Sequence, residues 1–206
     1  MRRAVGSYVR KGYGGGGGIA GRVGNSARAA ARMMGFAQAI RDQGFQEAIK
    51  QFGLQGLVGK PIEQAAAILI DAFAEEGVTT DDNIAREAWC EAVQEMIEAG
   101  ITDFENLTPE QWSQMVETFL SKAIELRTFN EIGNEVVGIA PDVATSDQIE
   151  QDLASLIRGQ VQDKIVPLIQ DGQVRSINEL NQYVAEIVSC AGDYIDALAG
   201  EEEEES

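Results

Sequence analysis

Few side chains in this 206-residue chain could carry out nucleophilic or metal chemistry. The chain has no histidine, which excludes Ser-His-Asp and Cys-His nucleophile pairs and histidine-ligated zinc. Its two cysteines, Cys90 and Cys190, do not form a Cys-x-x-Cys pair, so a four-cysteine zinc site is also excluded. We therefore predict that the chain is not an enzyme and that it binds neither a metal nor a cofactor.

Three other patterns resemble functional motifs but favour simpler interpretations. Residues 16–21 satisfy the spelling of a dinucleotide-binding glycine motif, yet no predicted strand precedes them, so we interpret them as linker. Residues 59–61 end like a phosphate-binding loop but lack its first glycine and its serine or threonine. Four glutamates share a predicted helix face, and without a Glu-x-x-His pair they indicate a solvated surface: Glu87, Glu91, Glu95 and Glu98.

Charge is distributed unevenly along the chain, whose formal net charge is −18. Residues 1–60 hold ten basic and two acidic side chains, whereas the remainder holds 6 basic and 32 acidic ones. Such an acidic body should repel nucleic acid and attract basic protein surfaces.

Apolar residues recur every three or four positions from residue 22 onward, which predicts helices. We expect them over residues 22–52, where Gly35 and Gly44 should interrupt the helix, and over 61–77, 79–100, 108–132, 146–169 and 176–198. Thr108 to Gln111 is a capping box, Gly100 should end the third helix, and Pro167 should bend or end the fifth. Gly133, Gly138 and Pro141 indicate a loop.

This pattern predicts an all-α bundle of five to six helices. We divide the chain into a flexible, basic, glycine-rich arm (residues 1–21), a helical domain (22–200) and an acidic tail (201–206). No apolar run is long enough for a membrane helix, and the start does not resemble a signal peptide. With only two cysteines, the chain is expected in the reducing cytoplasm.

The arm is the candidate binding segment. Its candidate contact residues are basic or aromatic side chains interspersed with glycines: Arg2, Arg3, Tyr8, Arg10, Lys11 and Tyr13. It could dock on a partner protein, remain a tail without fixed contacts, or bind nucleic acid by stacking bases on tyrosine and neutralising phosphate.

Residues 127–133 form a polar stretch in an otherwise amphipathic helix. Arg127 and Asn130 could cap a neighbouring helix or loop, and with Phe129 and Gly133 we assign them a structural role.

Six stretches, taken in order, resemble one family. They are RAVGSYVR (3–10), GLQGLVGKP (53–61), IAREA (84–88), Phe104 with LTPEQ (107–111), IELRTFNEIG (124–133) and LIRG (156–159). Together they are similar to QatB, the family of accessory proteins of the bacterial Qat anti-phage defence system. The likeness extends to about residue 165, and we cannot match the region after residue 166.

The resemblance implies a non-enzymatic, cytoplasmic interaction subunit. Its implied partners are the QueC-like enzyme and the ATPase of the same operon, with the TatD-like nuclease as a further candidate. The QueC-like enzyme is implied to recognise or modify the amino-terminal arm. A nucleic-acid adaptor that uses the same arm, or a helical scaffold without a ligand, is the alternative.

Overall fold

The computed structural model describes residues 24–74, 79–140, 142–170 and 177–204. These residues contain helices and no strand, which confirms the predicted all-α class. The elements are α2 (Gly24–Gln43), α3 (Phe45–Gln51), η1 (Gln55–Leu57), α4 (Ile62–Phe73), α5 (Thr80–Glu98), α6 (Pro109–Ile139), α7 (Val143–Lys164), α8 (Val166–Gln170) and α9 (Ile177–Glu204).

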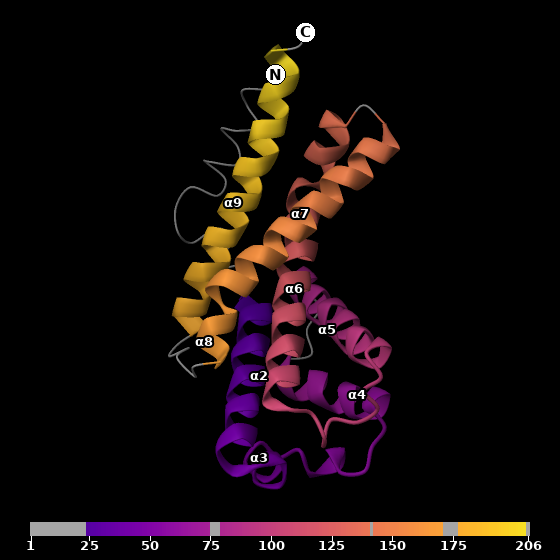
Figure 1. The fold of residues 1–206 in the computed structure, drawn as a ribbon, viewed down its shortest axis with the longest axis vertical. Helices are drawn as coiled ribbons and strands as arrows, with labels where there is room; N and C mark the ends of the chain where they lie inside the picture. Colours follow the sequence, from indigo (N-terminus) through magenta and orange to yellow (C-terminus); the bar gives the residue numbers. More distant parts are fainter. Residues whose placement is uncertain (1–23, 75–78, 141, 171–176, 205–206) are drawn as a thin grey trace.

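Helix α6 is the central element of the fold (Figure 1). At 31 residues it is about 46 Å long. Helices α2 and α5 pack against it, and α4 contacts both of them in the lower part of the view. Helices α7 and α9 contact α6 and each other, and α9 also reaches α2. The body therefore has two parts that share α6.

Aromatic rings form the centre of the lower part. The Phe36 ring lies 5.3 Å from that of Trp112 and 5.8 Å from that of Phe73. Trp89 is 6.3 Å from both Phe73 and Phe104, and the Phe104 and Trp112 rings are 5.6 Å apart. These five rings form a closed circuit that joins α2, α4, α5, α6 and the loop before α6.

In the upper part the apolar residues follow the expected helical spacing. On α7 the buried side chains recur every fourth residue: Ile149, Leu153, Ile157, Val161 and Ile165. On α9 they include Leu180, Val184, Ile187 and Ala191, as the sequence predicts. Tyr194 and Leu198, predicted for the same seam, are only partly buried and pack at the edge of the core.

Several predicted helix ends are confirmed. Thr108 and Gln111 exchange hydrogen bonds of 2.8 and 3.2 Å, which is the predicted capping box. Gly100, at φ 85°, ends α5, and the amides of Gly100 and Ile101 donate to the carbonyls of Ile97 and Met96. The predicted break near Pro167 is also present, because α7 ends at Lys164 and α8 begins at Val166.

Other predicted boundaries are wrong. Of the two interruptions predicted in the first helical stretch, the one at Gly44 separates α2 from α3, but the one at Gly35 does not form because α2 continues through it. The loop predicted from Gly133 and Gly138 does not form there, since α6 continues to Ile139. A glycine inside a helix costs about 1 kcal/mol, which the neighbouring turns of an established helix can offset. Helix α9 likewise extends into the acidic tail as far as Glu204.

Two glycines in different backbone conformations offer a matched test of the fold. Gly44 has φ 84°, a conformation that other residues adopt at a cost of about 1–3 kcal/mol. Gly159 lies inside α7, and a Cβ built there meets nothing within 4 Å. Urea unfolding should show Gly44→Ala less stable than the wild type by that amount and Gly159→Ala more stable by about 0.5–1 kcal/mol. Equal effects of the two substitutions would contradict the backbone assignment.

Candidate functional site

The first candidate site is the root of the amino-terminal arm, where the described chain begins at α2. The Asn25 amide donates to Asp81 Oδ2 over 2.7 Å, and the Ser26 hydroxyl donates to Asp81 Oδ1 over 3.2 Å. A carboxylate from the first turn of α5 thus receives the free donors at the start of α2. This contact attaches the root of the arm to the body.

Asp82 holds the same junction from the other side. Its Oδ2 accepts hydrogen bonds from the Thr79 amide (2.9 Å) and the Thr79 hydroxyl (2.6 Å). Its own amide donates to the Thr79 hydroxyl oxygen over 3.2 Å, which completes the capping box of α5. The Asn25 side-chain amide donates to Asp82 Oδ1. The beginnings of α2 and α5 are therefore joined through two adjacent carboxylates.

The two carboxyl groups have pKa values shifted in opposite directions. Burial raises the pKa of Asp81, although the Asn25 amide, the Ser26 hydroxyl and the Arg127 charge act against that shift. The hydrogen bonds from Thr79 lower the pKa of Asp82. Asp82 therefore stabilises the fold through its ionised form, whereas ionisation of Asp81 costs free energy.

Three of the four residues singled out near the middle of α6 can be located individually. Arg127 is 8% exposed and close enough to Asp81 for its charge to lower the pKa of that carboxyl group. Phe129 is partly buried against the core, and Asn130 is exposed. Gly133 lies within α6 and not in a loop. Arg127 thus lies at the arm root, and the others do not join it.

The arm itself lies outside the described residues. This holds for each of its predicted contact residues: Arg2, Arg3, Tyr8, Arg10, Lys11 and Tyr13. Their role stays a prediction.

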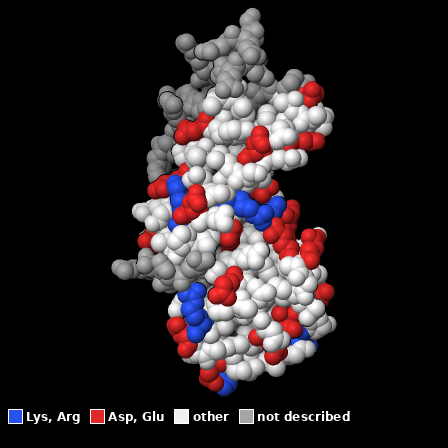
Figure 2. All heavy atoms as spheres, in the orientation of Figure 1, with Lys and Arg blue, Asp and Glu red and all other residues white. Residues whose placement is uncertain are grey.

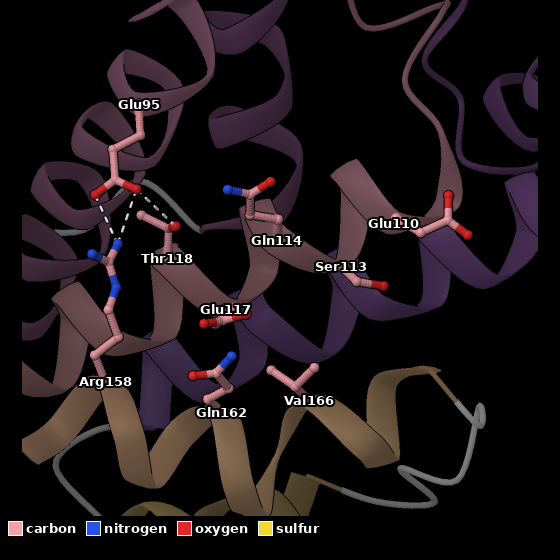
Figure 3. A pocket seen from close by; sticks show the side chains of 9 residues that line it. All are labelled: Glu95, Glu110, Ser113, Gln114, Glu117, Thr118, Arg158, Gln162 and Val166. Atoms are coloured by element: carbon pink, nitrogen blue, oxygen red, sulfur yellow. Dashed lines mark hydrogen bonds and ion pairs between the residues drawn. The ribbon is translucent and has the colours of Figure 1, made fainter. Parts of the chain in front are cut away.

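The second candidate site is a cleft of about 410 Å³ between α6 and α7 (Figure 3). Its lining is mostly polar: Glu95, Glu110, Ser113, Gln114, Glu117, Thr118, Arg158, Gln162 and Val166. Successive turns of α6 form one wall, α7 and the start of α8 form the other, and α5 supplies Glu95.

One ion pair closes an end of this cleft. Arg158 Nη2 lies 2.9 Å from both carboxylate oxygens of Glu95, and the Thr118 hydroxyl donates to Glu95 Oε2 over 3.1 Å (Figure 3). Glu95 therefore links α5, α6 and α7. Its predicted role as part of a purely solvated helix face is incomplete, because Glu95 and also Glu91, which pairs with Lys122, contact neighbouring helices.

The other two carboxylates of the cleft differ in environment. Burial raises the pKa of Glu117, with Arg158 acting in the opposite direction and Glu95 adding to the shift. The pKa of Glu110 is lowered by its own backbone amide and by Thr108 at the start of α6. The cleft thus combines one carboxyl group whose ionised form is stabilised, Glu110, with one whose ionised form is destabilised by burial, Glu117.

Sequence patterns alone did not indicate either site. Asp81 and Asn25 are 56 positions apart, and Glu95 and Arg158 are 63 apart. Glu110, Arg127 and Arg158 do belong to stretches that carry the family resemblance, which was a signal for these positions but not for their pairing. Among the described residues, no group of three or more His, Cys, Asp or Glu side chains could hold a metal ion. No described helix is long and apolar enough to cross a membrane.

The fold and these two sites define an all-α protein with a fixed arm root and an acid-lined cleft. The chain belongs to the QatB family, because the family model described as "Qat anti-phage system associated protein QatB" matches residues 14–193. No curated protein and no solved structure matches it.

The family match changes the extent of the resemblance. It reaches residue 193, so the region after residue 166, which we could not match, belongs to the family domain. It begins at residue 14, so the stretch 3–10 and most of the predicted arm lie before the matched region.

The opposite pKa shifts at the arm root predict opposite effects of pH. Because the pKa of Asp82 lies below its ordinary 3.8, the stability that Asp82 contributes is complete above that pH and is lost as the pH falls further. The difference in unfolding free energy between wild type and Asp82→Asn, measured by urea unfolding, should therefore be constant from pH 7 to about pH 4 and shrink as the pH falls below 3.8.

Asp81→Asn is the matched control for this measurement. Burial raises the pKa of Asp81, so its ionisation costs stability as the pH rises through that pKa. The free energy of unfolding of the wild type should therefore fall relative to that of Asp81→Asn between about pH 3 and pH 7. The same pH trend in both variants would contradict the assignment.

Proposed function

We propose that this chain is a non-enzymatic interaction subunit of a Qat anti-phage system. Its helical body binds partner proteins, and its arm is recognised or modified by the QueC-like enzyme of the same operon. The ATPase is a second partner of the body, and the TatD-like nuclease is a further candidate. The family assignment supports the defence role, and the partners follow from the family resemblance.

The fixed arm root is the observation that carries the proposal. Hydrogen bonds from Asn25 and Ser26 to Asp81 and Asp82 attach the first turn of α2 to α5. A segment that begins at such an anchor can enter another protein's active site while the body remains folded. Residues 1–23 carry five basic and no acidic side chains, so their recognition by an acidic partner surface is favourable.

Charge also favours protein partners over nucleic acid. Acidic side chains are spread over much of the face shown in Figure 2, and basic ones form only a few small groups. This surface would repel phosphate, whereas a basic protein surface would be attracted to it. We therefore place nucleic-acid binding by the arm second to protein binding.

Removal of the arm tests the proposal in cells. A deletion of residues 2–18, expressed with the neighbouring genes, should abolish protection against phage, because the partner enzyme loses its recognition segment. Circular dichroism of the purified variant should retain the helical signal, since the deleted residues precede α2. Full protection by the deletion variant would overturn the role of the arm.

Two matched charge-reversal variants distinguish partner contacts made by the arm from partner contacts made by the body. Arg10→Glu combined with Lys11→Glu should weaken co-purification of the QueC-like enzyme with the carboxyl-terminally tagged chain. The control, Lys50→Glu combined with Lys60→Glu, makes the same charge change at exposed positions of the body and should leave it unchanged. Equal losses in both variants would indicate that net charge alone, and not the arm, governs the interaction.

A further inference from the structure

The acid-lined cleft has a charge that its own walls do not neutralise. Three carboxylates and one guanidinium line it, and the guanidinium of Arg158 is bonded to Glu95. Glu110 and Glu117 also line the cavity, so its lining has two more carboxylates than guanidinium groups, although the charge of Arg41 acts on Glu110 from outside the lining and that of Arg158 acts on Glu117. The cleft volume of about 410 Å³ is that of a site for a few side chains rather than for a whole domain.

The arm carries the complementary charge. It contains four basic and no acidic side chains, and Arg10 and Lys11 are adjacent. Glu110 and Glu117 are two turns apart on α6, about 10 Å along the helix. Because residues seven positions apart share one face of a helix, both carboxylates are presented on the same side of α6, and two basic residues of one segment can approach them there.

The position of the arm root brings these groups within reach of each other. The root is held at Asp81, close to Arg127, and Glu117 lies ten residues earlier on α6, about 15 Å along its axis. Lys11 lies thirteen positions before Gly24, and such a segment spans up to about 43 Å. The run Gly14 to Gly18 has no side chains to obstruct the return of the chain.

We propose that the chain's own amino-terminal arm docks in the cleft between α6 and α7, with Arg10 and Lys11 facing Glu117 and Glu110. The tether favours this occupant, since attachment at α2 gives the arm a high effective concentration at the cleft. A docked arm is shielded until a partner displaces it. This contact concerns the isolated chain and does not rest on the proposed role in defence.

Zero-length cross-linking of the full chain tests the contact directly. Lys11 is the single lysine among residues 1–23, so a carbodiimide should join its amine to Glu117 or Glu110. We expect this link, identified by mass spectrometry, in the monomer band. In a mixture of isotopically light and heavy chains, a link within one chain never joins a light to a heavy peptide, so mixed light–heavy links in about half of the products would assign the cleft to a second copy and overturn the proposal. No link from Lys11 to the cleft would also overturn it.

A pair of charge-neutralising variants provides an independent measurement. Glu110→Gln combined with Glu117→Gln should make trypsin cleave after Arg10 and Lys11 roughly twofold to fivefold faster per ion pair lost. The control, Glu87→Gln combined with Glu98→Gln, removes two exposed carboxylates of α5 outside the cleft and should leave the rate unchanged. Equal rates in wild type and in the cleft variant would overturn the docking contact. Because no partner is present, that result would leave the defence role to be judged by its own experiment.

Discussion

The contact between Phe36 and Trp112 is the interaction on which the arrangement of this protein depends. Their rings meet edge to face, with an interplanar angle of 88°, and both are completely buried. This contact joins α2 to the first turn of α6, and Phe73, Trp89 and Phe104 complete the circuit through α4, α5 and the preceding loop. Aromatic pairs of this geometry contribute beyond their buried area, and each ring here has two partners in the circuit.

Both candidate sites depend on this packing. The lower part of α6 carries one wall of the cleft, and α5 supplies Glu95 at its end and Asp81 at its beginning. Because the aromatic circuit sets the positions of α2, α5 and α6, it also determines where the arm leaves the body and where the cleft opens. The two sites are thus mechanically connected through α6.

Ion pairs between charged side chains also connect the helices. Glu91 and Glu95 on α5 reach Lys122 on α6 and Arg158 on α7, so the acidic face is partly a set of interhelical contacts. Such exposed pairs contribute little free energy each. Their main consequence is to neutralise the few bases of the body, so that the remaining surface is strongly acidic and suited to a basic segment.

The all-α class, the helical periodicities, the Thr108 capping box and the break near Pro167 were determined by the sequence itself, because each follows from spacing or from a local backbone property. The sequence pattern did not predict that α6 continues through Gly133, because the neighbouring helical turns override the local preference of one glycine. Only the tertiary structure decided the pairing of Asp81 with Asn25 and of Glu95 with Arg158. Contacts between residues more than fifty positions apart depend on how helices pack, and a periodic pattern contains no information about which faces meet.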